Sequence, residues 1–223
     1  ALLAIENLPD LNETITVPED IFEELTAQDA SVAGFNPYEQ PTVRDLLYGV
    51  LLPSGADACE TLARAVGGSE EGFVAMMNQK AEELGLTNTH FENCTGLHND
   101  NHYSTCRDIA VLMSECLKSD TFREIVTREV YTTEATASHP EGITLYDTML
   151  HRFTSYEMST TLENGAVIEG GKTGFTDEAG QCLVSFAEYG GEEYILVTAE
   201  AMTDSGSAVD SIADASTVYG RLQ

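Results

Sequence analysis

Two segments rich in β-branched and aromatic residues constrain the fold of this chain most strongly. CLVSFAEY at 182–189 and YILVTAEA at 194–201 are separated by the four residues GGEE. Two short runs of this kind joined through a glycine pair are typical of a β-hairpin. The chain is therefore expected to contain an antiparallel sheet.

Further strands are predicted at 129–133 (EVYTT) and 166–175 (AVIEGGKTGF), and the apolar spacing of 208–222 predicts a helix that packs on the sheet. Before residue 129 the apolar residues recur at helical spacing in four segments, 1–8, 42–52, 69–85 and 104–118. The sequence thus predicts one α/β domain over 1–223, with a helical subregion at about 19–128 and a sheet-forming part at about 129–223.

Residues suited to helix ends flank these segments. Thr42 begins a Thr-x-x-Asp pattern that resembles a capping box, and Ser69 is an expected N-cap. Gly85 is an expected C-terminal stop, and Ser104 or Thr105 is expected to cap the fourth helix.

Charge composition excludes one class of function. The chain has 38 acidic and 10 basic residues, a formal net charge of −28. A nucleic acid would be repelled by such a protein, so no nucleic-acid partner is expected. No apolar run is long enough to span a membrane, and the N-terminal residues do not resemble an export signal.

Lys172 is one of three lysines, and it lies in EGGKTGFTDEAG at 169–180. On a strand, Lys172 and Gly174 would share one face while Thr173 points to the other. The surrounding glycines would let another backbone approach closely. Such a strand could pair with an extended peptide, with the lysine placed for a carboxylate or a proton transfer. A turn with a solvated lysine is the alternative.

Cysteine and histidine spacing gives little support for a metal site. The five cysteines have no C-x-x-C spacing, and buried free thiols are favoured over a bridge between Cys94 and Cys106. His90, His98 and His102 are expected to hydrogen-bond within a loop rather than bind a metal. No cofactor is expected.

Longer phrases carry a specific resemblance. FVAMMNQKAEELGL, THFEN, GLHNDNHYST and KTGFTDEAGQCLV occur in order along the chain. This sequence resembles the serine D-alanyl-D-alanine carboxypeptidases of the low-molecular-mass penicillin-binding protein family. The resemblance implies a fold like that of the β-lactamases and DD-peptidases, an antiparallel sheet flanked by helices plus a helical subregion.

In this family a Ser-x-x-Lys, a Ser-x-Asn and a Lys-Thr-Gly motif meet in one cleft. The resemblance makes Lys172 the lysine of Lys-Thr-Gly and Ser54 the serine of Ser-x-Asn, which would pass a proton to the leaving amine. The positions implied to contact substrate are Gly55, Ala56, Thr173, Gly174 and Phe175, the last through a backbone N–H in the oxyanion hole.

The sequence departs from the family pattern in three places. Ala56 stands where the family has Asn. The role of the asparagine amide, to hold the substrate backbone or orient the nearby lysine, is therefore vacant or taken by a neighbour such as Asp57. An alternative interpretation of Ser54 is a helix N-cap. Residues 199–210 contain no arginine for the substrate carboxylate. No Ser-x-x-Lys occurs in the 223 residues.

By resemblance, the nucleophile motif and the first strands of the sheet would precede Ala1. The 223-residue chain is therefore expected to lack activity and to self-associate through its uncovered sheet. The intact parent is expected to hydrolyse the terminal D-Ala of peptidoglycan stem peptides through an acyl-serine, to bind β-lactams, and to be extracytoplasmic, secreted or membrane-anchored. A non-catalytic cell-wall interaction protein with the same fold is the alternative. A β-lactamase is disfavoured because no Glu-x-x-x-Asn pattern, which would suggest a deacylating carboxylate, occurs between the helical region and Lys172.

Overall fold

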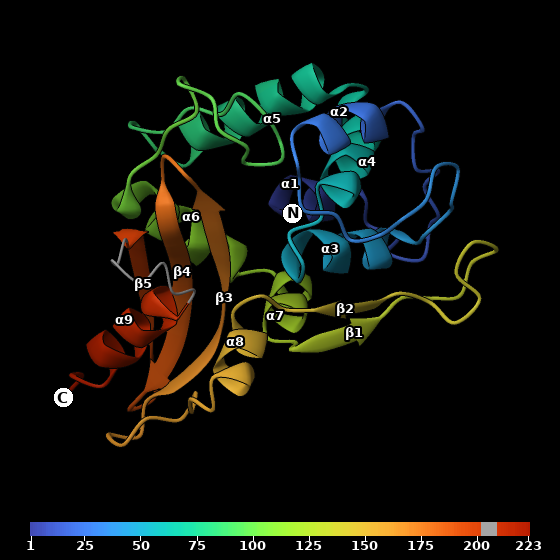
Figure 1. The fold of residues 1–223 in the computed structure, drawn as a ribbon. Helices are drawn as coiled ribbons and strands as arrows, with labels where there is room; N and C mark the ends of the chain where they lie inside the picture. Colours follow the sequence, from blue (N-terminus) through green and yellow to red (C-terminus); the bar gives the residue numbers. More distant parts are fainter. Residues whose placement is uncertain (202–208) are drawn as a thin grey trace.

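A three-stranded antiparallel sheet lies at the centre of the C-terminal part (Figure 1). The computed structural model describes residues 1–201 and 209–223. The strands are β3 (Val167–Thr176), β4 (Gly180–Tyr189) and β5 (Glu192–Ala201), in the order β3-β4-β5. The predicted pairing of 182–189 with 194–201 is confirmed.

The β4–β5 turn is shorter than the four residues GGEE. Tyr189 pairs with Glu192, so only Gly190 and Gly191 form the loop. Their φ angles are 64° and 85°. A two-residue hairpin turn of the I′ type requires positive φ at both positions, which glycine adopts without steric cost. The glycine pair therefore fixes the register of this hairpin.

Helices cover both faces of the sheet. Helix α9 (Asp210–Tyr219) packs on β4 and β5 from one side, and α6 (Cys106–Cys116) packs on the same strands from the other. Side chains on β4 alternate accordingly. Leu183 and Ala187 join the cluster around α9, whereas Phe186 joins the core of the helical part. This two-residue alternation is the pattern of a strand buried on both faces.

Most of the remaining helices build a large apolar core beside the sheet. The remaining helices are α1 (Leu2–Asn7), α2 (Ile21–Ala27), α3 (Val43–Leu51), α4 (Ala56–Gly67), α5 (Glu70–Glu83), α7 (Asp120–Val126) and α8 (Leu150–Ser155). Helix α8 instead contributes Phe153 to the cluster around α9, and α5 contributes Phe73 to a smaller cluster. Most of the core side chains come from α3 and α4 and from the segments that contact them. No helix in the described part of the chain has the length and apolarity needed to cross a membrane.

The predicted helix ends are confirmed. Thr42 and Asp45 form a reciprocal capping box on α3, and the Ser69 hydroxyl accepts the N–H of Gly72. Thr105, not Ser104, caps α6. After α5, the N–H of Gly85 donates to Glu82 O and that of Leu86 to Ala81 O, with Gly85 at φ 71°. This pair of bonds is the Schellman arrangement, which ends a helix at a glycine.

The strand predicted at 129–133 is confirmed and lies outside the main sheet. The segment 129–133 contains β1 (Val130–Thr132), but β1 pairs with β2 (Thr144–Tyr146) in a separate two-stranded sheet. It therefore adds nothing to the main sheet. The division of the chain at residue 129 into a helical subregion and a sheet-forming part stays a prediction. Helix α6, from the predicted helical subregion, packs directly on β4 and β5. Residues 202–208, which include part of the arginine-free stretch, lie outside the described residues.

Candidate active site

Ser54 and Lys172 meet although 118 positions separate them in the sequence. The Lys172 ammonium group donates a hydrogen bond to Ser54 Oγ and a second one, of 2.8 Å, to Thr173 O. Lys172 lies on β3, and Ser54 lies between the end of α3 and the start of α4. The fold thus joins two of the sequence motifs at one point.

Ser54 adopts a left-handed backbone conformation, with φ of 61°. Few residues with a Cβ take this conformation, and it is enriched at functional sites. Gly55, not Ser54, precedes α4 as its N-cap, and no side chain caps that helix. The N-cap interpretation of Ser54 is therefore wrong, and the serine hydroxyl instead contacts the lysine.

Gly55 and Ala56 lie beneath the loop formed by residues 31–35, which is called the covering loop below. Both are buried, and Ala56 N donates to Ser31 O at 2.8 Å. A Cβ on Gly55 would lie 2.6 Å from the Cβ of Ala33, so the close approach of this loop requires glycine. Substrate contact by Gly55 and Ala56 stays a prediction.

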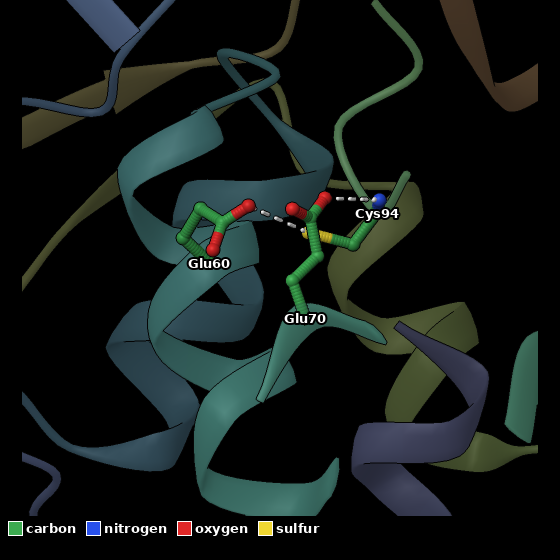
Figure 2. Close-up of side chains that lie close together, drawn as sticks. All are labelled: Glu60, Glu70 and Cys94. Atoms are coloured by element: carbon green, nitrogen blue, oxygen red, sulfur yellow. Dashed lines mark hydrogen bonds between the residues drawn. The ribbon is translucent and has the colours of Figure 1, made fainter. Parts of the chain in front are cut away.

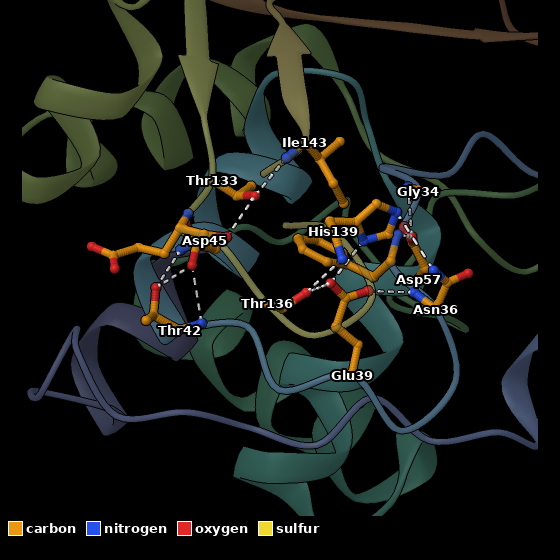
Figure 3. A network of polar contacts seen from close by, with 12 residues as sticks. Gly34, Asn36, Glu39, Thr42, Asp45, Asp57, Thr133, Thr136, His139 and Ile143 are labelled. Atoms are coloured by element: carbon orange, nitrogen blue, oxygen red, sulfur yellow. Dashed lines mark hydrogen bonds and ion pairs between the residues drawn. The ribbon is translucent and has the colours of Figure 1, made fainter. Parts of the chain in front are cut away.

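Asp57 is not free to replace the missing asparagine. Its carboxylate accepts the backbone N–H groups of Ala33, Gly34 and Phe35 at 2.7, 2.9 and 3.0 Å, and Figure 3 shows it beside Gly34. The side chain is fully buried. Asp57 therefore anchors the covering loop, and the suggestion that it takes over the asparagine role is wrong.

The glycines of β3 have different surroundings. A Cβ on Gly170 would lie 2.4 Å from Val126 O, and one on Gly171 would lie 2.5 Å from Val184 O. The predicted close backbone approach is thus confirmed at these two positions, but the neighbours belong to the protein itself. At Gly174 the nearest atom would be 3.9 Å away, and Phe175 is 64% exposed. The open part of the strand therefore begins at Gly174.

Thr173 points away from Lys172, as the two-residue period predicts. Its hydroxyl lies 2.6 Å from that of Thr148, and the residue is 8% exposed. Across β4, Lys172 pairs with Val184 and Thr173 with Leu183. The other edge of β3 carries, among the described residues, a single bridge between Thr161 and Val167. The edge beside Lys172 is thus open to pairing with an extended peptide.

Burial dominates the electrostatics of the pair. It lowers the pKa of Lys172, while the negative charges of Asp147 and Cys59 partly oppose that effect and Arg152 adds to it. Asp147, 1% exposed, was missed from the sequence, where it is an ordinary acidic residue after a short strand. Burial raises its pKa to about 7, against the opposing effects of backbone N–H groups and Lys172.

The histidine-rich loop is held by hydrogen bonds of the predicted kind. His90 Nε2 lies 3.0 Å from Glu92 Oε1, and His102 Nδ1 accepts the N–H of Glu92 at 3.3 Å. All five cysteines are free, so the bridge between Cys94 and Cys106 is not formed. Cys106 is exposed, which corrects the expectation of a buried thiol there.

One group in the described part of the chain has ligand atoms close enough for a metal ion, namely Glu60, Glu70 and Cys94 (Figure 2). Its atoms lie within 4.8 Å of one another. They already contact protein groups, because the Cys94 thiol donates to Glu60 Oε1 at 3.4 Å and Arg64 Nε lies 3.4 Å from Glu60 Oε2. Glu60 Oε2 is buried without a hydrogen bond from the described residues, and burial together with the nearby charge of Glu70 raises the pKa of Glu60.

Comparison with known proteins identifies the family of this chain. The profile of the peptidase S11 family, described as D-alanyl-D-alanine carboxypeptidase, matches residues 2–203. The D-alanyl-D-alanine carboxypeptidase DacF of Bacillus subtilis is 36% identical over 168 residues, which are 75% of this chain and 40% of that protein. The D-alanyl-D-alanine carboxypeptidase of Streptomyces sp. strain K15 is 36% identical over 200 residues, 87% of this chain and 66% of the relative.

Solved structures show the same fold. The crystal structure of the Streptomyces K15 DD-transpeptidase superposes with a TM-score of 0.79 at 30% identity, covering 98% of this chain and 84% of that one. The chain belongs to the D-alanyl-D-alanine carboxypeptidase family, peptidase S11. The predicted fold, an antiparallel sheet with flanking helices as in the DD-peptidases, is confirmed.

Proposed function

We propose that this chain carries the Ser54–Lys172 part of a serine D-Ala-D-Ala carboxypeptidase that acts on peptidoglycan stem peptides through an acyl-serine. The observation that carries the proposal is the hydrogen bond from Lys172 Nζ to Ser54 Oγ. It joins the Lys-Thr-Gly strand to the serine of the second motif, as the chemistry of acyl transfer requires. β-Lactams are proposed ligands of the intact enzyme, and its proposed location is extracytoplasmic.

The direction of this hydrogen bond suits a proton relay. Because Lys172 donates to Ser54 Oγ, the hydroxyl proton of Ser54 is free to move toward a leaving amine. Ser54 would then recover a proton from the lysine. Burial lowers the pKa of Lys172, so this transfer costs less than it would from a solvated ammonium group.

The open edge of β3 is the proposed place for substrate. A peptide lying along Gly174 and Phe175 would add a strand to the sheet, and the backbone N–H of Phe175 would stabilise the oxyanion. The side chain of Thr173 lies on the opposite face of β3, where its hydroxyl is hydrogen-bonded to that of Thr148. Its proposed role is to support the strand that binds the substrate. In this arrangement Lys172 is the cation available for the substrate carboxylate.

The nucleophile is proposed to be a different serine from Ser54. Acyl transfer in this family starts at Ser-x-x-Lys, and none occurs within the 223 residues. We therefore expect the 223-residue polypeptide by itself to form no adduct with a fluorescent penicillin. An adduct on Ser54, located by mass spectrometry, would contradict this assignment of roles.

A second candidate is a non-catalytic cell-wall interaction protein with the same fold. The observation that favours it is the buried Ala56 with Asp57 committed to the covering loop, which leaves no amide at the asparagine position. The two candidates are distinguished by an assay of the whole protein that the gene encodes, called the gene product below, on a peptide ending in D-Ala-D-Ala. Release of D-Ala that falls strongly in the Lys172→Ala variant supports the enzyme. Peptide binding without release supports the interaction protein.

A further inference from the structure

Asp147 and Thr148 follow β2 and tie together three separate parts of the chain. The N–H of Asp147 donates to Glu129 O at 2.8 Å, beside the start of β1. The N–H of Thr148 donates to Leu52 O at 3.1 Å. Leu52 is the C-cap of α3 and lies two positions before Ser54. The backbone of this dipeptide thus reaches the turn that carries the serine.

The side chain of Thr148 reaches the strand that carries the lysine. Its hydroxyl lies 2.6 Å from that of Thr173, which follows Lys172 directly. Both ends of the Ser54–Lys172 contact are therefore held by a single residue, through its backbone on one side and its hydroxyl on the other. A short hydroxyl–hydroxyl bond between the part-buried Thr148 and the buried Thr173 resists separation, because breaking it leaves Thr173 with an unpaired polar atom.

The carboxylate of Asp147 is buried and half satisfied. Oδ1 accepts the N–H groups of Met149 and Leu150 at 2.9 and 2.6 Å. Oδ2 is buried and has no hydrogen-bond partner among the described residues. A buried carboxylate oxygen without a hydrogen bond is costly unless an opposite charge is near. The positive charge of Lys172 acts on Asp147 and lowers the pKa of its carboxyl group, against the larger effect of burial.

The other charged groups around the pair are few. Glu129 opposes ionisation of Asp147, and Arg152 opposes protonation of Lys172. Cys59 also faces Lys172, but burial raises the pKa of its thiol to about 11. Burial raises the pKa of Asp147 to about 7, so its carboxylate is ionised above that pH. Its carboxylate is then the main negative charge acting on Lys172.

We propose that Asp147 and Thr148 are positioning residues for the Ser54–Lys172 pair. Thr148 sets the separation between the Leu52 turn and β3, and the buried carboxylate of Asp147, next to it in the chain, supplies negative charge that favours the charged form of Lys172. The catalytic meaning of this arrangement rests on the proposed function. The arrangement itself is a property of the folded chain and can be measured without turnover.

The three lysines of the chain make the charge half of the proposal directly observable. Lysine labelled with ¹³C at Cε gives one NMR signal each for Lys80, Lys118 and Lys172, assigned by Lys→Arg variants. In Asp147→Asn, the titration midpoint of Lys172 is expected to fall by about one pH unit or more, a tenfold change in proton affinity. Lys80 and Lys118 should not move. A Lys172 midpoint within about 0.2 units of wild type, well below the size of an ion-pair effect, would overturn it.

The geometric half is tested at Thr148. Thr148→Val removes the hydroxyl at nearly constant volume, and the Lys172 signal is expected to shift toward those of exposed lysines, while Thr148→Ser restores it. Thr132→Val is a matched control, because the Thr132 and Thr144 hydroxyls form a similar contact of 3.3 Å in the β1–β2 sheet. A Lys172 signal unchanged in Thr148→Val, or shifted equally in Thr132→Val, would refute the role of Thr148.

Two further measurements keep the test independent of folding and of activity. If Thr148→Val does not fold, Thr173→Val breaks the same contact from the other side and should move the Lys172 signal alike; an unmoved signal refutes the contact. The expected NMR changes in a gene product that releases no D-Ala would leave the positioning role standing and reject the proposed function. Unchanged NMR signals in a gene product that releases D-Ala would reject the positioning role and leave the proposed function standing.

Discussion

Lys172 on β3 donates a hydrogen bond to Ser54, whose backbone is held at φ 61° directly before the N-cap of α4. An ordinary conformation at Ser54 would turn the chain in another direction and move the hydroxyl. The left-handed backbone conformation of Ser54, which is strained for a residue with a Cβ, therefore places its hydroxyl against Lys172. Gly55 N, bonded to Gly49 O at 2.8 Å, helps to hold this turn.

The strain at Ser54 predicts a difference between two substitutions. Ser54→Ala and Ser54→Gly both remove the hydroxyl, but only glycine adopts positive φ without a steric penalty. Ser54→Gly is expected to be more stable than Ser54→Ala by about 1 kcal/mol in urea unfolding. An alanine variant as stable as the glycine variant would show that the turn carries no strain.

The glycines of β3 predict a contrast along one strand. Gly170→Ala places a Cβ 2.4 Å from Val126 O, and the backbone must shift to admit it. We expect the free energy of unfolding to fall by about 2 kcal/mol or more. Gly174→Ala is the matched control, since its nearest neighbour would be 3.9 Å away, and a change within about 0.5 kcal/mol is expected. Equal losses at both positions would contradict the packing of β3 against α7.

A buried glutamate links two loops and predicts a pH dependence of stability (Figure 3). Glu39 accepts hydrogen bonds from Thr136, from Asn36 N at 2.8 Å and, at 2.8 Å, from His139 Nδ1. Burial acts to raise the pKa of Glu39, but these bonds outweigh it and the pKa is lowered below 4.5. The stabilisation is therefore present above about pH 4.5 and is lost as the pH falls through the lower, folded-state pKa.

Glu39→Gln keeps the shape of the side chain and removes its titration. Urea unfolding from pH 3 to 7 should show wild type losing more stability than the variant on acidification, with the two curves converging at the acid end. Parallel curves over the whole range would mean that Glu39 does not contribute through its charge.

Thiol exposure predicts an order of chemical modification. Cys106 is exposed, whereas burial raises the pKa values of Cys59 and Cys116 to about 11 and that of Cys94 even further. Because the thiolate is the reacting form, iodoacetamide at pH 8 should label Cys106 first in the native protein. Peptide mapping after short exposure checks this. Early labelling of Cys94 would contradict its contact with Glu60.

Local signals explain which parts of the fold could be predicted from the sequence. The glycine pair of the β4–β5 turn, the Thr42 capping box and Gly85 each act through a few neighbouring residues, and all three were predictable. The helices α2, α7 and α8 have 7, 7 and 6 residues, and segments this short give a weak apolar period, although the equally short α1 lies in the predicted segment 1–8. They form because the surrounding core buries their apolar side chains.

The candidate site likewise has some features that local sequence patterns predict and others that depend on long-range contacts. The two-residue period of a strand correctly put Lys172 and Thr173 on opposite faces, and the motif resemblance pointed to Ser54 as the partner of Lys172. The positive φ of Ser54 and the commitment of Asp57 to the covering loop depend on residues more than twenty positions away. Asp147 likewise acquires its properties from burial. Long-range contacts of this kind leave no local pattern in a single sequence.

The central claim is that Ser54 and Lys172 act as one proton-relay unit, and a double-mutant cycle tests it most directly. The measurement is the rate constant for acylation of the gene product by a fluorescent penicillin in wild type, Ser54→Ala, Lys172→Ala and the double variant. Each single substitution is expected to lower the rate by roughly 10²- to 10⁴-fold, the typical contribution of proton transfer. Because groups that act as a unit are not additive, the double variant should be no slower than the slower single variant. Losses that multiply in the double variant would contradict the account.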